Sequence, residues 1–212
     1  MKIISTNLAT PTTIIWNGKE ETTGIYKNPT NKPIFIGKSD VKNDEVSDRE
    51  HHGGFYKACY MFSAEQYPYW KNLYPNLEWN WGMFGENLTV SEFDETQVYL
   101  GDIYKVGEAL VQISQYREPC YKLGYKFGTQ TVLKQFIEHG FGGTYLSILE
   151  EGYVNVDDTF NLVKRPENRI SVADLFRLIH SKDKDQDLLK IVTNSEAIPP
   201  KKQALLKSYI KD

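Results

Sequence analysis

The chain has 212 residues, of which 40% are hydrophobic and 25% charged, and its formal net charge is −3. This balance is typical of a globular protein with a core of its own, and it excludes a disordered or strongly basic chain. The apolar runs are short, and the opening segment MKIISTNLATPTT lacks the apolar centre of an export signal. We therefore expect a cytoplasmic protein whose partners include no membrane and no nucleic-acid duplex.

Much of the chain predicts strands joined by tight turns. Residues 2–7 and Thr12–Trp16 are β-like, and Asn17-Gly18 is a dipeptide that supplies positive φ angles for a hairpin turn. Further along, Ile103–Val106 and the alternating apolar residues 109–113 flank a turn at Gly107-Glu108 and predict a second hairpin. The opening is therefore a β-meander, and the second hairpin leads into the segment QISQYREPCYKLG.

Two helices are predicted outside these hairpins. In SAEQYPYWKNLYP, Ser63 with Gln66 resembles a capping box, and Pro68 confines the regular helix around it. Apolar side chains at helical spacing predict a longer helix over residues 129–139, which Gly140 ends. The aromatic residues between Tyr67 and Phe84 are interpreted as core, although a planar ligand could also stack on some of them.

In the last part of the chain, the spacing of apolar residues changes from that of strands to that of helices. Strands return around Glu151-Gly152, and the barrel-like part is expected to end near Val163. After KRPEN, SVADLFRLIHS, opened by Ser171 with Asp174, is followed by DQDLLKIVTN and by PPKKQALLKSYIKD, which predict three short helices. Because three short helices can hardly form a core alone, we expect them to dock on the β part.

The two cysteines, Cys59 and Cys120, can form no more than one disulfide, and free thiols are expected in a reducing compartment. Cys120 follows Pro119, which stiffens the chain, and Arg117, whose fork of donors suits phosphate or carboxylate. A thiolate beside this cation would be stabilised. A plainer interpretation makes Cys120 a small buried side chain and Arg117 a member of a surface ion pair, and the segment alone leaves both open.

The segment SDREHHGGFYKAC is a second candidate for chemistry. It places Asp48, His51 and His52 before Gly53-Gly54, so a loop with proton-transfer groups could approach a ligand closely. A metal site made by the two histidines alone is not favoured, because no Cys-x-x-Cys or His-x-x-x-His spacing supports it. Alternatively, His52 is simply fixed to the backbone of a glycine-rich turn.

Several separate segments, in order, resemble one known family. GIYKNP, EHHGGFYKACYMFSAEQYPYW, FGENLTV and VYLGDIYKVGEALVQISQYREPCYKLGYKF are similar to motifs of MOSC-domain proteins of the YiiM type, named after the C-terminal domain of molybdenum cofactor sulfurase. Two departures concern the surroundings of the site: Tyr116 stands where the family usually has Pro, and KNDEVSD replaces a Gly-Asp-Gly-Gln-Ala-Asp segment. They leave Asp48, Arg117, Pro119 and Cys120 in place.

The resemblance implies a fold and a division of the chain. The fold class is mainly β with α, a MOSC-type β-barrel with peripheral helices, over residues 1–164. Residues 165–212 resemble the small C-terminal three-helix domain, called 3-alpha, of the same family. We expect these helices to shape the substrate entrance or a partner surface and to contribute no metal ligand.

The resemblance also implies a molybdenum cofactor, molybdopterin with a phosphate tail, whose metal takes Cys120 as its protein ligand. A soft thiolate suits such a sulfur-rich metal site. Lys27 and Arg117 are the cationic candidates for the phosphate, although Lys27 could also be an exposed loop lysine. Glu86 and Asn87 could bind the polar edge of the pterin or only stabilise a turn, and these two interpretations remain open.

Related MOSC enzymes reduce N-hydroxylated compounds, including N-hydroxylated purine base analogues, and the resemblance implies the same detoxifying oxidoreductase activity here. Besides Cys120, the catalytic candidates are His52 as proton donor and Asp48 as its orienting partner or an acid itself. The sequence has no Gly-x-Gly-x-x-Gly nicotinamide motif and no iron–sulfur cysteine set. Electrons should therefore come from a separate reductase protein, and pyridoxal phosphate is not expected.

Two other classes of function stay open at this point. A non-catalytic carrier or sensor would bind the cofactor through the same Cys120 and pass it on. A structural protein with an inert thiol would bind neither molybdenum nor pterin, which analysis of the purified protein would reveal.

Overall fold

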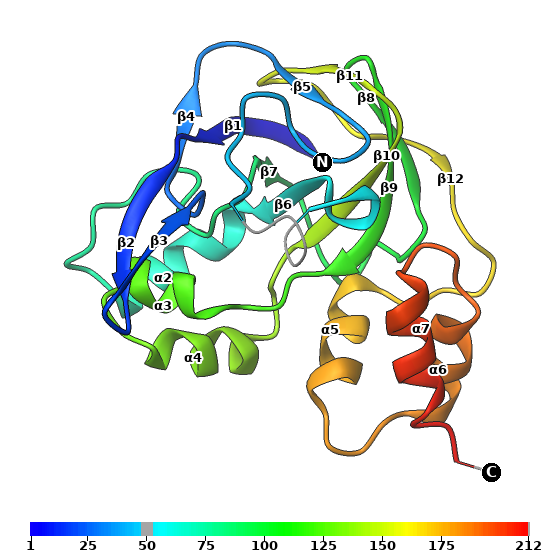
Figure 1. Cartoon of the computed structure of the whole chain (residues 1–212). Helices are drawn as coiled ribbons and strands as arrows, with labels where there is room; N and C mark the ends of the chain where they lie inside the picture. The colour runs from blue at the N-terminus through cyan, green and yellow to red at the C-terminus, as the bar shows by residue number, and fades with distance from the viewer. Residues whose placement is uncertain (48–52, 212) are drawn as a thin grey trace.

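The computed structural model describes residues 1–47 and 53–211 and is mainly β with helices at its periphery (Figure 1). The strands are β1 (Lys2–Ala9), β2 (Thr12–Trp16), β3 (Lys19–Thr23), β4 (Lys27–Thr30), β5 (Ile34–Ile36), β6 (Cys59–Ser63), β7 (Leu88–Ser91), β8 (Ile103–Val106), β9 (Ala109–Tyr116), β10 (Thr144–Glu150), β11 (Gly152–Val154) and β12 (Asn161–Lys164). The helices are η1 (Phe55–Lys57), η2 (Ala64–Gln66), α2 (Tyr67–Leu73), α3 (Tyr121–Lys126), α4 (Thr131–His139), α5 (Val172–His180), α6 (Gln186–Thr193) and α7 (Pro200–Lys207). Within the described ranges, no helix is long and apolar enough to cross a bilayer.

In the described part of the chain, one mixed sheet of eight strands has the order β12-β8-β9-β10-β6-β7-β1-β4. Neighbours pair antiparallel, except that β6 and β7 run parallel with Met61 opposite Leu88. Two short sheets, β11-β5 and β2-β3, add to it. Figure 1 shows α2, α3 and α4 gathered beside one part of the sheet and α5, α6 and α7 beside another. The predicted class, mainly β with peripheral helices and three helices at the end, is confirmed.

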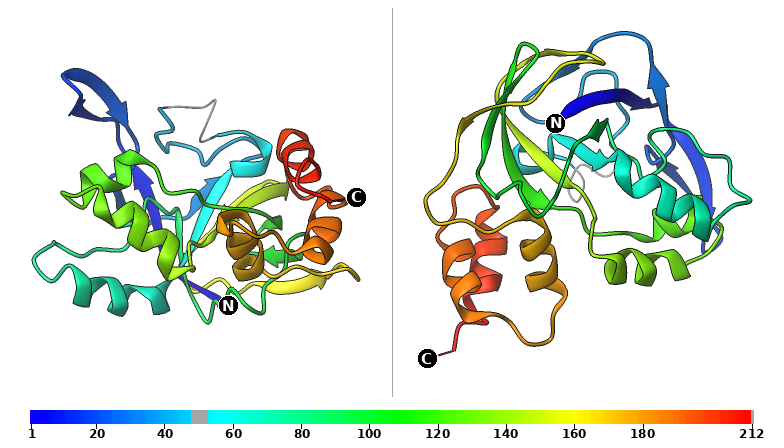
Figure 2. Two further views of the ribbon diagram at one scale, coloured as in Figure 1. Left: turned by 90° about the horizontal axis from the view of Figure 1, so that it is seen from below. Right: turned by 180° about the vertical axis from the view of Figure 1, so that it is seen from behind.

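The hairpins form where the sequence predicts them. Asn17 and Gly18 have φ angles of 50° and 76° between β2 and β3, and Gly107, with a φ of 51°, turns the chain between β8 and β9. Left-handed backbone of this kind is favourable for glycine and tolerable for asparagine, which explains why these residues mark the turns. Figure 2 shows in its left view that the β2–β3 hairpin projects from the body of the molecule.

The predicted helices also form, with one correction. Gly140 ends α4 with a φ of 82°, and Pro68 lies in the first turn of α2. The predicted capping box at Ser63 and Gln66 is wrong: Ser63 precedes η2 without capping it, and its hydroxyl donates to Glu65 Oε2 at 2.7 Å instead. The nearby carboxylate is the stronger acceptor for that hydroxyl, so the helix N-terminus receives no side-chain oxygen from it.

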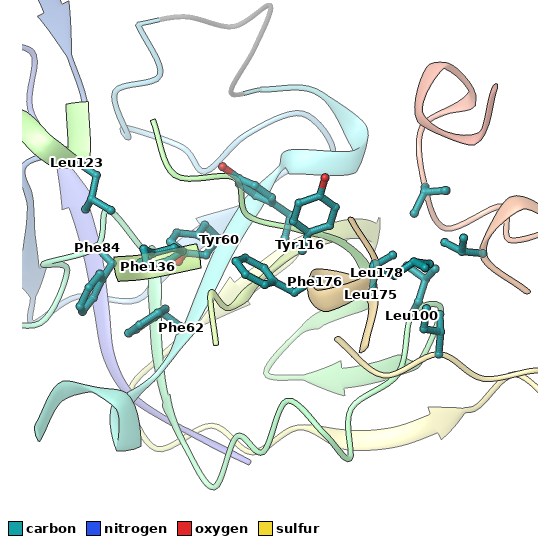
Figure 3. Close-up of a cluster of buried hydrophobic side chains, with 14 of the residues drawn as sticks. Tyr60, Phe62, Phe84, Leu100, Tyr116, Leu123, Phe136, Leu175, Phe176 and Leu178 are labelled. Carbon is teal, nitrogen blue, oxygen red and sulfur yellow. The ribbon is translucent and has the colours of Figure 1, made fainter. Parts of the chain in front are cut away.

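Two buried clusters hold these elements together. One lies within the sheet and includes Ile3, Met61, Leu88, Val111, Ile113 and Leu146. The other joins α2, α4 and the C-terminal helices, and Figure 3 shows part of it, with Phe62, Phe84 and Phe136 on one side and Leu175, Phe176 and Leu178 on the other. Tyr67, Trp70 and Phe84 belong to this second cluster, so the interpretation of that aromatic segment as core is confirmed.

The three C-terminal helices dock on the rest of the protein, as the sequence predicts. Ser171 caps α5 by accepting a hydrogen bond from the Asp174 N–H at 3.0 Å. The ring of Phe176 in α5 meets the ring of Tyr116 in β9 edge to face, with 5.8 Å between centroids (Figure 3). These helices therefore share buried surface with the β part, and the division into domains at residues 164 and 165 stays a prediction.

Candidate functional site

The loop between β9 and α3 carries the candidate thiol. β9 ends at Tyr116, and Cys120 lies in extended backbone immediately before α3, where its carbonyl accepts a hydrogen bond from the Leu123 N–H at 2.9 Å. The next residue, Tyr121, stacks on Trp16 of the projecting hairpin with 4.7 Å between ring centroids. The loop is thus held on this side by a contact that joins residues about a hundred positions apart.

Cys120 opens into a pocket with an empty volume of about 640 Å³, part of which is open to solvent. Its walls come from several separate parts of the chain: Thr23, Gly24, Ile25 and Lys27, residues 44–47, Lys57, Ala58 and Tyr60, Gly85 and Asn87, Arg117, Cys120 and Lys122, and Tyr145. Both cysteines are free, but only Cys120 lines this pocket and is partly exposed. Cys59 is 1% exposed in β6, and burial raises the pKa of its thiol, which makes it a poor nucleophile or metal ligand.

Arg117 lies inside the pocket wall and not at the surface. The side chain is 6% exposed, and its Cζ lies 4.9 Å from the centroid of the Tyr60 ring. Its Nη1 atom is buried without a hydrogen-bond partner among the described residues. The surface ion-pair interpretation of Arg117 is therefore wrong. A buried Nη1 donor without an acceptor is costly unless a bound anion completes its hydrogen bonds.

Lys122 is a second buried cation in this pocket and was not predicted from the sequence. The residue is 8% exposed and lines the pocket two positions after Cys120. It contacts the face of the Tyr121 ring at 5.9 Å, but it forms no hydrogen bond or salt bridge with a described residue. The only sign of it in the sequence is its position two residues after the cysteine.

Lys27 also lines the pocket, but a carboxylate already neutralises its charge. The Nζ atom bonds to Asp44 Oδ2, and the two side chains are 7% and 2% exposed. The alternative that Lys27 is an exposed loop lysine is therefore wrong. Asp44 in turn accepts hydrogen bonds from the Ala9 N–H and from Asn87 Nδ2, each at 2.8 Å. A buried pair of this kind stabilises the wall only while both partners are present.

Glu86 and Asn87 lie side by side in the chain but in different environments. Glu86 is fully buried outside the pocket, and its carboxylate accepts hydrogen bonds from the N–H groups of Gly82 and Phe84 and from the hydroxyls of Tyr67 and Thr89. This geometry favours the turn-stabilising interpretation of Glu86. Asn87 lines the pocket, although its side chain accepts from the Tyr60 N–H and donates to Asp44.

Tyr145 adds a hydroxyl to the pocket next to Arg117. Burial raises the pKa of this hydroxyl, although the charge of Arg117 acts in the opposite direction. The hydroxyl is therefore a neutral hydrogen-bond donor at physiological pH. Asp48, His51 and His52 lie outside the described residues, so their predicted roles stay predictions. Ser47, at the described end of that segment, lines the pocket.

Residues 48–161 match the family model of the MOSC domain. This chain belongs to the MOSC-domain family. YflK of Bacillus subtilis, an uncharacterized protein, is 34% identical over 196 residues, which cover 92% of this MOSC chain and 88% of YflK. A Gibberella moniliformis protein named Reductase is 33% identical over 175 residues, which cover 81% of this chain and only 31% of that protein.

The fold comparison agrees with the resemblance seen in the sequence. The crystal structure of YiiM from Geobacillus stearothermophilus has a TM-score of 0.82 to this MOSC chain, with 30% identity and 99% of both chains covered. The YiiM-type assignment is therefore confirmed, and the similarity includes the C-terminal helices. The family name refers to molybdenum cofactor sulfurase, which connects the family with that cofactor.

Proposed function

We propose that this protein is a molybdenum cofactor-dependent reductase that removes oxygen from N-hydroxylated compounds, such as N-hydroxylated purine base analogues. The observation that supports it most is the buried Arg117 Nη1 atom, which lacks a partner in the described structure and belongs to the same pocket wall as Cys120. Family membership and a relative named Reductase support the same class of activity.

The donor set of the pocket fits such a cofactor. Cys120 offers one soft sulfur ligand, which suits molybdenum already bound by the sulfurs of a pterin. Arg117 offers a buried Nη1 donor without a partner, and Lys122 offers an ammonium group without an acceptor in the described residues; both suit a phosphate. Lys27 has further donor hydrogens but is already paired with Asp44, so we rank it after Lys122. Asn87 is the better candidate for the pterin edge, because Glu86 lies outside the pocket.

The reaction converts an N–OH group into N–H and water and consumes two electrons and two protons. The bound cofactor would supply the redox chemistry, and a separate reductase protein would supply the electrons. The chain's own residues then have simpler tasks. Arg117 and Lys122 hold the anionic tail, and the Tyr145 hydroxyl donates a hydrogen bond into the pocket. His52, oriented by Asp48, delivers protons to the departing oxygen.

The test is to purify the full chain from a host with intact molybdenum cofactor synthesis. Molybdenum and pterin are measured per chain, and consumption of hydroxylaminopurine is followed with a chemical reductant in place of the partner protein. We expect bound molybdenum and turnover. Bound cofactor without turnover of N-hydroxylated bases or amidoximes would support the carrier or sensor alternative, and the absence of both molybdenum and pterin would overturn the assignment.

A further inference from the structure

The loop that carries Cys120 is contacted by the last helix of the chain. Lys202 in α7 donates to Glu118 Oε1 at 2.7 Å and lies 3.4 Å from Gln115 Oε1. Its Nζ atom also lies 4.1 Å from the centroid of the Tyr116 ring. One lysine thus contacts three of the four residues 115–118, and the fourth is Arg117.

The buried Tyr116 supports the contact between Lys202 and Glu118. It is 2% exposed, and its hydroxyl donates to the same Glu118 oxygen at 2.6 Å. Its ring packs against Phe176 of α5, as Figure 3 shows. The residue that replaces the family's usual Pro therefore fixes the loop by a hydrogen bond and by packing, where a Pro would fix it through its own backbone.

The same segment also contacts η1, which adjoins another part of the pocket wall. Gln115 is 2% exposed, and its Nε2 donates to the Tyr56 carbonyl at 3.2 Å. Tyr56 belongs to η1, and the next residue, Lys57, lines the pocket. A displacement of α7 would therefore move both the loop 117–120 and η1.

We infer that Lys202 is a positioning residue, which holds the loop 117–120 so that the Cys120 thiol stays beside Arg117 and Lys122. The inference rests on the proposed function only in taking Cys120 as the working thiol of the protein. It also gives the C-terminal helices a defined task, because Lys202 of α7 and Phe176 of α5 both contact the segment before Cys120, while no described residue of these helices lines the pocket.

The measurement is the rate at which Cys120 is alkylated in the cofactor-free full chain, with the modified peptide identified by mass spectrometry. Neutral iodoacetamide reports the exposure of the thiol, and the ratio of iodoacetate to iodoacetamide rates reports the positive charge around it. The variants are Lys202→Met, Lys202→Arg, Glu118→Ala and the double variant Lys202→Met with Glu118→Ala. Lys201→Ala is the matched control, because Lys201 is an exposed neighbour on the same helix.

We expect Lys202→Met and Glu118→Ala each to raise the iodoacetamide rate and to lower the rate ratio by about two- to fivefold, the range of a partly exposed ion pair. The double variant should match the single variants, Lys202→Arg should restore both values, and Lys201→Ala should leave them unchanged. The two single variants change the net charge in opposite directions. A purely electrostatic effect would therefore lower the ratio of iodoacetate to iodoacetamide rates in Lys202→Met and raise it in Glu118→Ala. A raised ratio in Glu118→Ala would overturn the inference.

Unchanged alkylation in a folded Lys202→Met variant would also overturn it, and so would additive effects in the double variant. If Lys202→Met does not fold, Glu118→Ala tests the same contact from the exposed side of the loop. Because alkylation needs no molybdenum, failure of the proposed function is seen separately, as wild-type protein that acquires no cofactor in a competent host.

Discussion

The guanidinium of Arg117 lies over the ring of Tyr60, with 4.9 Å between Cζ and the ring centroid. The Tyr60 hydroxyl donates to the Gly142 carbonyl at 2.7 Å, so the ring itself is fixed. Arg117 is therefore oriented by an aromatic face, and no described carboxylate forms a salt bridge with it. Its charge and its Nη1 donor remain available to an anion, which a carboxylate partner would have prevented.

This arrangement predicts that Arg117 lowers stability while it supports binding. In the cofactor-free protein, Arg117→Met should raise the free energy of unfolding by about 1–3 kcal/mol, because it removes a buried cation whose Nη1 donor has no acceptor. The same variant, produced with intact cofactor synthesis, should lose most of its molybdenum. Urea denaturation and metal analysis measure the two effects. Arg177→Met, at an exposed position, should change neither, and a destabilised Arg117→Met would show that the guanidinium is satisfied in the free protein.

Substitutions of the two cysteines should differ in their effects on molybdenum content and activity. Cys120→Ser should reduce molybdenum per chain and reductase activity to background, because a hydroxyl is a poor substitute for a soft thiolate ligand. Its effect on stability should stay within about 0.5 kcal/mol, since the side chain is partly exposed. Cys59→Ala should lower stability somewhat, because it leaves space in the core, but should keep both molybdenum and activity. An active, molybdenum-loaded Cys120→Ser variant would remove Cys120 from the assignment.

Local patterns in the sequence were sufficient for the hairpins and for several helix ends, but the predicted opening β-meander is wrong, because β1 pairs with β4 and β7 while β2 and β3 form a sheet of their own. The Asn17-Gly18 turn, the end of α4 at Gly140 and the cap of α5 at Ser171 depend on the φ angles or hydrogen bonds of a few consecutive residues. The motif around Cys120 was found for the same reason, since Arg117 and the thiol are neighbours in the chain. The error at Ser63 arose because Glu65, two positions away, offered its hydroxyl a better acceptor.

The rest of the site depends on residues that only tertiary packing brings together. Lys27 meets Asp44 across 17 positions, which turned an apparently exposed lysine into part of a buried wall. Lys202 contacts Glu118, which lies 84 positions earlier in the chain, and no local sequence pattern predicts that contact. Lys122 was missed because its significance depends on burial and on the lack of a nearby acceptor, and a sequence shows neither.

The buried Glu95 should make the protein less stable as the pH rises. It is 1% exposed, its Oε1 accepts the Gly143 N–H at 3.0 Å, and its Oε2 has no hydrogen-bond partner in the described structure. Burial raises the pKa of this carboxyl to about 8, against the opposing influence of the backbone N–H groups. Between about pH 4.5 and pH 8, the folded state therefore holds a proton that the unfolded chain has lost. The free energy of unfolding should fall as pH rises through this window.

Glu95→Gln tests this expectation, because the amide is neutral at every pH and keeps an oxygen for the Gly143 N–H. At pH 9 the variant should be more stable than wild type by about 2–4 kcal/mol, and at pH 4.5 the two should be nearly equal. Thermal or urea denaturation across this range measures the difference. Glu92→Gln, at an exposed position of the same region, is the control. A constant difference at all pH values would show that Glu95 does not titrate in this window.

The last prediction separates a reductase from a carrier through His52 and Asp48. Loss of an N–OH oxygen as water requires protons on the reaction path, and removal of a positioned general acid commonly costs about a hundredfold or more in rate. A carrier has no such step. His52→Ala and Asp48→Asn should therefore keep molybdenum and pterin but slow the consumption of an N-hydroxylated purine by about that factor. His51→Ala is the matched control for the histidine pair and should retain most of the activity.

The assay uses a chemical reductant, so that electron supply does not depend on the mutations or on a missing partner protein. Under these conditions, the rates of His52→Ala and wild type should also differ in their pH dependence, because the variant no longer contains the titrating imidazole. If the wild type is active and both variants match it, His52 and Asp48 are not the proton donors, while the reductase assignment stands. Variants that lose the cofactor would instead place these residues among the groups that bind it.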